Sequence, residues 1–261
     1  MGHSHSIYVF DSEYEESDYW QPKIYKRISH YISEGYGVVY VAEENENSAI
    51  QRFSRMDFPV EDYVESGALT IISRDVFYSP TLTSSVLTEQ WNKIFSGIRR
   101  KNSGKEIKGL VGIGMPADSF FTSEMFQQRL VDYECVVAEG YDGSFEAMCC
   151  YTTDLLDKMP LRQIIMLLNA HENTAHKDDT LREWNNERGI DVIRRGLDEA
   201  LGDYVSELVF KLLLGDFGMD KDAMISHPDR FENKLRILFG PPAAEIVLTK
   251  IRAELKREIV F

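Results

Sequence analysis

Two adjacent cysteines and one histidine are the residues of this chain whose types best suit chemistry. Cys149 and Cys150 lie in the run FEAMCCY, and His171 ends the run PLRQIIMLLNAH. A thiolate beside a base is a nucleophile, and thiolates and histidines bind metal ions. In a strand, however, the two thiols point to opposite faces of a sheet, so they cannot bind one metal together. Buried cysteine is also an ordinary small apolar residue.

The remaining motifs do not strengthen a catalytic or metal-binding interpretation. HENTA lacks the second histidine of a zinc-binding HExxH motif, and His171 and His176 are five residues apart, which is wrong for one helix face. Two readings of His171 stay open: an ordered residue at the end of a core helix, or part of a ligand pocket. We interpret His3 and His5 as a plain N-terminus or an added tag rather than a metal-binding tail.

The turn after the first expected strand argues against nucleotide binding. It reads VFDSEYEESDYW, with five carboxylates and no glycine. A phosphate-binding turn needs glycines so that the backbone can approach the phosphate, and carboxylates repel it. Glu43 and Glu44 end the second expected strand, but without a phosphate cradle they have no nucleotide to act on. The sequence therefore predicts no catalytic residue, no metal site and no cofactor.

The composition excludes several classes of protein. The chain has 261 residues and a net charge of -14, from 43 acidic and 29 basic residues. This charge argues against direct nucleic-acid binding and against anionic membrane surfaces. No apolar run approaches the roughly 20 residues that span a bilayer, and three cysteines do not form a disulfide framework. We expect a cytoplasmic protein that does not bind membranes.

Hydrophobic patterning predicts strands that alternate with helices. Such alternation is typical of an α/β fold with a mainly parallel sheet and helices on both faces. The expected strands are 6–10, 37–44, 68–73, 108–115 and 145–151, and the expected helices are 11–33, 48–56, 83–101, 119–138 and 160–171.

The chain changes character after residue 172. Residues 173–189 are polar and predict a linker or an exposed helix. From residue 190 onward the apolar residues follow helical spacing, and a proline start and a glycine–proline stop bracket one amphipathic helix. We therefore expect an α/β domain over 1–172, a polar linker over 173–189 and a small all-α domain over 190–261.

Several short motifs, in order, resemble the MEDS sensory domain of regulators such as the dichloromethane-dehalogenase repressor. They are YVFDSEYEE, YVAEEN, GALTIIS followed by Tyr78, the pair Tyr133 and Glu134, CCY ending at Tyr151, and LLNAH. The resemblance covers about two thirds of the chain and implies a RecA-like or KaiC-like sheet that has lost its phosphate loop. It also implies a sensor of small molecules such as hydrocarbon derivatives, with Tyr133, Glu134, Tyr151 and His171 as ligand-binding residues. Glu44 joins them as a strand-end acid.

The chain from about residue 190 resembles a helical output domain of archaeal, Nitrosopumilus-type signalling proteins, on the run ISHPDRFENKLRILFGPPAAEIVLTKIRAEL. We identify no DNA-binding domain in the sequence. The leading hypothesis is a non-catalytic sensor that binds an unknown small molecule and signals to a protein partner, or to a second copy in a homodimer, through its C-terminal helices. The alternatives are a nucleotide-binding or thiol-dependent hydrolase using Glu43, Glu44, Cys150 or His171, and a structural protein-interaction module.

Overall fold

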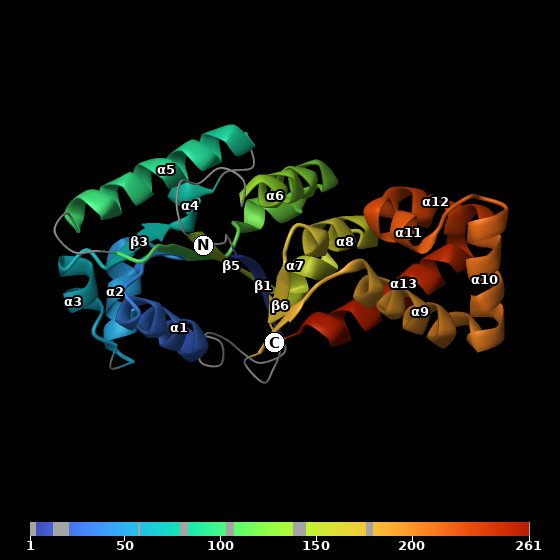
Figure 1. Ribbon diagram of the computed structural model, residues 1–261, viewed down its shortest axis with the longest axis horizontal. Coiled ribbons are helices and arrows are strands. Elements are labelled where there is room, and N and C mark those ends of the chain that lie inside the picture. The colour runs from blue at the N-terminus through green and yellow to red at the C-terminus, as the bar shows by residue number, and fades with distance from the viewer. Residues whose placement is uncertain are drawn as a thin grey trace.

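A seven-stranded sheet forms the centre of the molecule (Figure 1). The computed structural model describes residues 4–12, 21–56, 58–78, 83–102, 107–137, 145–175 and 180–260. The strands are β1 (Ser4–Phe10), β2 (Gly37–Ala42), β3 (Leu69–Ser73), β4 (Leu110–Gly114), β5 (Phe145–Thr152), β6 (Asn173–Ala175) and β7 (Leu181–Glu183). Their order is β3-β2-β4-β5-β1-β6-β7, and only the β6–β7 pair is antiparallel. The predicted mainly parallel α/β fold is confirmed.

The register of β1 against β5 decides which side chains meet. Ile7 lies opposite Cys149 and Val9 opposite Tyr151, although the two strands are far apart in the chain. Because partners on neighbouring parallel strands point to the same face, and alternate residues share a face, His5 and Cys149 lie on the same side of the sheet.

Helices cover both faces of this sheet, as the alternating pattern predicts (Figure 1). On one side lie α1 to α3, and on the other lie α4 to α6. The α-helices up to Asn169 are α1 (Gln21–Ser33), α2 (Glu46–Ser54), α3 (Val60–Glu65), α4 (Arg74–Phe77), α5 (Ser84–Lys101), α6 (Glu124–Val137), α7 (Thr153–Asp157) and α8 (Leu161–Asn169). The first part of the helix expected over 11–33 falls on residues 13–20, outside the described residues.

Local capping explains where two of these helices begin. The side chain of Thr83 accepts a hydrogen bond from the backbone N–H of Val86, and this N-cap starts α5 where it is expected. The helix expected over 119–138 is instead split into a 3-10 turn, η1 (Asp118–Thr122), and α6. Ser123 between them has extended backbone, and its hydroxyl accepts from the N–H of Phe126, so it begins a new helix.

The C-terminal part is helical, as predicted, and lies together at one end of the molecule (Figure 1). It consists of α9 (Asn186–Leu201), α10 (Asp203–Gly215), α11 (Lys221–Ser226), α12 (Pro228–Phe239) and α13 (Pro241–Ile259). Helices α11, α12 and α13 all contact α8. At its end the chain returns to the sheet, where Val260 forms a parallel bridge with Val9.

The short strands β6 and β7 lie within the segment for which the sequence predicts a linker or an exposed helix. All residues of β7 are exposed, so it carries no apolar alternation that would predict a strand. Backbone pairing holds the segment instead: Glu172 N–H donates to the carbonyl of His5, and Trp184 N–H donates to that of Glu172. The division of the chain into domains stays a prediction.

None of the helices in the described part of the chain is long and apolar enough to cross a membrane.

Candidate functional site

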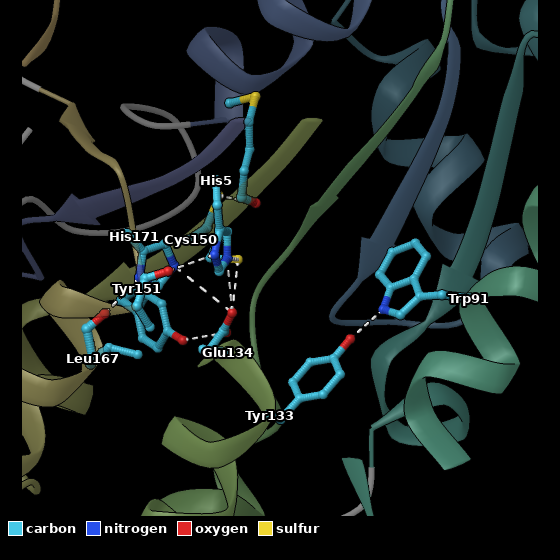
Figure 2. A network of polar contacts seen from close by, with 11 residues as sticks. His5, Trp91, Tyr133, Glu134, Cys150, Tyr151, Leu167 and His171 are labelled. Atoms are coloured by element: carbon cyan, nitrogen blue, oxygen red, sulfur yellow. Dashed lines mark hydrogen bonds and ion pairs between the residues drawn. The ribbon is translucent and has the colours of Figure 1, made fainter. Parts of the chain in front are cut away.

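Four side chains from distant parts of the chain meet beside the central strands. They are His5 of β1, Glu134 of α6, Cys149 of β5 and His171, which follows α8; we call them the His–Glu–Cys cluster. One nitrogen, oxygen or sulfur atom of each lies within 4.8 Å of that of every other. The two histidines and Glu134 are buried, and Cys149 is half-buried. Figure 2 shows both histidines and Tyr151 converging on Glu134.

Glu134 is the centre of the contacts. Its Oε2 lies 3.1 Å from Nε2 of His5, 3.3 Å from Sγ of Cys149 and 3.8 Å from Nε2 of His171. Its Oε1 accepts a hydrogen bond of 2.7 Å from the hydroxyl of Tyr151. The two imidazole rings lie against each other, with centroids 3.9 Å apart. Every one of these groups therefore faces the same carboxylate.

Backbone carbonyls fix the orientation of both imidazole rings. Nδ1 of His5 lies 2.9 Å from the carbonyl of Ala170, and Nδ1 of His171 lies 2.7 Å from that of Leu167. A carbonyl oxygen only accepts, so Nδ1 carries the hydrogen in both rings. In a neutral ring Nε2 then holds a lone pair. Among the described residues, Nε2 of His171 has no hydrogen-bond partner.

Burial and mutual contacts set the charges in the cluster. Burial, and then the proximity of His5, lowers the pKa of His171 to about 3, against the opposing effect of Glu134. Burial alone raises the pKa of Glu134, but the hydrogen bond from His5, the electrostatic interaction with both imidazoles and the hydrogen bond from Tyr151 outweigh it and hold the pKa at about 2. At neutral pH the cluster therefore contains a carboxylate and a neutral His171.

The two thiols differ in their surroundings. Cys149 donates to Glu134, whereas Cys150 is buried in the apolar core. Burial raises the pKa of Cys149 well above its usual range, and the Glu134 carboxylate raises it further. Burial also raises the pKa of Cys150. Both are therefore thiols rather than thiolates at neutral pH, which is the opposite of what a nucleophile requires.

The structure brings together three of the five residues that the sequence analysis places in a ligand site: Glu134, Tyr151 and His171. Tyr133 points away from them, because neighbouring helix residues face different directions, and accepts a hydrogen bond from the indole N–H of Trp91 (Figure 2). Glu44 is not part of the cluster; it forms a 2.7 Å ion pair with Arg52.

Sequence reasoning missed His5 and Cys149. The sequence predicts a plain N-terminus or an added tag at His5, but His5 lies inside β1 and is 1% exposed. The alternation of β1 is the sequence feature that could have identified His5 as an inward-facing residue, since His5, Ile7 and Val9 share a face of the sheet. Of the two thiols, Cys150 is nearer the strand end and was the stronger candidate, yet Cys149 is the one that contacts polar groups.

A small cavity adjoins the cluster, between β4, β5, α5 and α6. It has a volume of about 20 Å³, which is room for roughly one water-sized molecule. Glu134 and Cys149 of the cluster line it. Aromatic residues and glycines form most of the rest: Tyr78, Trp91, Tyr133, Phe145, Gly112 and Gly114. A side chain at Gly112 would begin 3.1 Å from the Trp91 ring, so glycine keeps this space open.

Comparisons with known proteins give a family match and a structural similarity. Residues 5–172, more than half of the chain, match the sequence model of the family described as MEDS: MEthanogen/methylotroph, DcmR Sensory domain. A crystal structure of uncharacterized protein PH0321 from Pyrococcus horikoshii in complex with an unknown peptide is similar over 71% of this chain and 94% of that chain, with 11% identity and a TM-score of 0.48. No curated protein matches significantly. The family match therefore carries the functional argument.

Proposed function

The chain belongs to the MEDS family of sensory domains, and on this premise we propose that it is a non-catalytic sensor of a very small molecule. The α/β part binds the molecule, and the C-terminal helices pass the signal to a protein partner. The raised pKa values of Cys149 and Cys150 support a sensor over a thiol-dependent hydrolase. The acidic turn after β1 supports it over a nucleotide-binding enzyme.

The cavity beside Glu134 is the observation that carries this proposal. Its lining is mainly apolar and aromatic, and Glu134 and Cys149 are part of it. Ligand sites combine apolar walls with a few placed polar groups in this way. The volume of about 20 Å³ holds roughly one water-sized molecule, so a ligand such as methanol or dichloromethane requires the lining side chains to move.

Filling the cavity should weaken binding. Ala147 lines it, and Ala147→Val adds two methyl groups, which occupy more than the available space while suiting a strand. We expect methanol or dichloromethane to raise the melting temperature of the unaltered protein saturably, because a ligand that binds the native state stabilises it. We expect the affinity to fall at least about tenfold in Ala147→Val, which removes about 1.4 kcal/mol of binding free energy or more.

The matched control is Val38→Ala, a buried change in β2 at a residue that does not line the cavity. It should lower stability but keep the ligand-induced shift. An equal shift in Ala147→Val and the unaltered protein would contradict binding in this cavity. A shift with ATP and magnesium instead would favour the nucleotide-binding alternative, and no shift with any small molecule would favour the structural interaction module.

Helix α8 links the site to the C-terminal helices in this proposal. It ends two residues before His171, and at its other end the side chain of Glu232, from α12, accepts from the backbone N–H of Arg162 at 2.7 Å. The Arg162 guanidinium also donates to the Glu232 carboxylate at 3.3 Å. A displacement of α8 caused by a ligand therefore acts directly on α12.

Removal of this link should lower the free energy of unfolding by a measurable amount. Glu232 satisfies an N–H of the first turn of α8, which has no partner within the helix. We expect Glu232→Ala to lower the free energy of unfolding in urea by about 2 kcal/mol, because a buried hydrogen-bonded cap is lost. Glu245→Ala is the control, since Glu245 is exposed and pairs with Arg236 on the surface. It should change stability by less than about 0.5 kcal/mol. Equal effects of the two changes would contradict a buried link.

A further inference from the structure

We propose that the His–Glu–Cys cluster binds one divalent transition-metal ion of the zinc type. The ligands are Nε2 of His5, Nε2 of His171, a carboxylate oxygen of Glu134 and Sγ of Cys149. This inference goes beyond the small-molecule sensor and does not depend on it, because it concerns the ion alone.

The spacing of the four atoms suits a tetrahedral site. Metal bonds of about 2.0–2.3 Å give tetrahedron edges of roughly 3.3–3.8 Å. Nε2 of His5 lies 3.2 Å from Sγ of Cys149 and 3.1 Å from Oε2 of Glu134. Oε2 of Glu134 lies 3.3 Å from Sγ of Cys149 and 3.8 Å from Nε2 of His171. An ion at the centre therefore needs displacements of only a few tenths of an ångström along these edges.

The outer contacts are those that metal-binding histidines usually make. A histidine ligand donates its other ring N–H to a carbonyl or carboxylate, which fixes the tautomer and the ring. His5 does this with Ala170, and His171 does it with Leu167. The carboxylate is held in the same way, because Tyr151 donates to its other oxygen. All three contacts leave the ligand atoms directed toward one another.

The cluster also has an excess of electron pairs that an ion would balance. The His171 side chain is 0% exposed, and its Nε2 has no hydrogen-bond partner among the described residues. A buried polar atom without a partner is costly. Nε2 of His5 and Oε2 of Glu134 are both acceptors at 3.1 Å unless a proton or a cation lies between them. A dication with one carboxylate, one thiolate and two neutral imidazoles gives a net charge of zero.

Binding is an exchange of protons for the ion. The metal bonds to Sγ of Cys149 as the S–H bond breaks, and the thiol proton passes to solvent. Any proton shared between His5 and Glu134 leaves in the same way. The donor set selects the ion: imidazole and thiolate favour zinc and neighbouring transition metals, whereas magnesium and calcium favour oxygen ligands alone.

The experiment uses the full chain without an affinity tag, stripped with a chelator and titrated with zinc sulfate and then, separately, with cobalt chloride. We expect one tightly bound zinc ion per chain by elemental analysis. With Co²⁺ we expect the near-ultraviolet absorption band of a metal thiolate. Cys149→Ser should abolish that band, and His171→Asn should weaken zinc binding by about 100-fold or more. Tyr151→Phe keeps all four ligands and should weaken binding by about tenfold.

Matched controls separate the cluster from incidental binding. Cys135→Ser removes an exposed thiol, and His227→Ala removes an exposed histidine. Both should keep the zinc ion and the cobalt band. The thiolate band is the decisive readout, because a folded Cys149→Ser protein that retains it would overturn the proposal. Failure of the unaltered protein to bind zinc would also overturn it, and neither result bears on small-molecule binding in the cavity. Should His171→Asn not fold, the conservative Tyr151→Phe variant provides the same comparison, and zinc affinity equal to that of the unaltered protein would count against the site.

Discussion

We expect Glu134→Ala to lower the free energy of unfolding by about 4 kcal/mol when measured in chelator, so that no metal ion contributes. The carboxylate is 4% exposed, and it is the acceptor for Tyr151 and the partner of His5. Its removal leaves the tyrosine hydroxyl, the imidazole and the Cys149 thiol without their common acceptor in a buried place. A cavity remains as well, and both effects reduce stability.

Urea denaturation of three variants checks this expectation. Glu134→Gln keeps the volume and one acceptor oxygen, so it should cost about half as much as the alanine change. Asp132→Ala, two residues earlier on α6, removes an exposed carboxylate that accepts a hydrogen bond from the side chain of Gln128. It should change stability by no more than about 0.5 kcal/mol. A loss of about 1 kcal/mol or less for Glu134→Ala would mean that the cluster is not a stabilising centre.

Gly196→Ala should be the second large change, at about 3 kcal/mol of destabilisation. Gly196 lies where α9 crosses α13, and a Cβ atom there would lie 2.5 Å from Cα and 2.8 Å from N of Ile251. These are backbone atoms, so no side-chain rotation relieves the contact. The two helices must separate, and the apolar packing between them is lost.

Gly97→Ala is the matched control for this substitution. Gly97 also lies within a helix, α5, but no atom lies within 4 Å of the position of an added Cβ. There the methyl group should stabilise the protein by about 0.5–1 kcal/mol, because alanine has the higher helix propensity. Thermal or urea unfolding should thus give changes of opposite sign. The same sign for both would contradict the close crossing of α9 and α13.

Local patterns predicted most of the fold. The hydrophobic patterns of β2 and α5 identify these elements without any long-range information. The pattern did not predict β6 and β7, because short exposed strands are held by backbone pairing and carry no apolar alternation. Nor did it show that Ser123 divides one expected helix, since a serine within an apolar period is also compatible with a continuous helix.

The candidate site was predictable only in part, for a physical reason. Motif spacing detects ligands that lie within one helix or loop, whereas His5 and Glu134 are 129 residues apart and His5 and Cys149 are 144 residues apart. Only the pairing of β1 with β5 brings them together. The resemblance supplied Glu134, Tyr151 and His171, but it did not supply the strand register that adds the other two.

The position of β1 between β5 and β6 has a consequence for how the chain acquires its structure. β1 is a buried strand inside the sheet, and its partners come much later in the chain, since Ser4 pairs with Glu146 of β5 and Ser6 with Asn173 of β6. Until then its apolar residues and unpaired backbone are exposed, a state that invites aggregation and chaperone binding. The chain must lose the entropy of closing a long loop before this pairing contributes favourable free energy, and this slows folding. The His–Glu–Cys cluster therefore forms only after His171 has been synthesised and β1 has paired with β5.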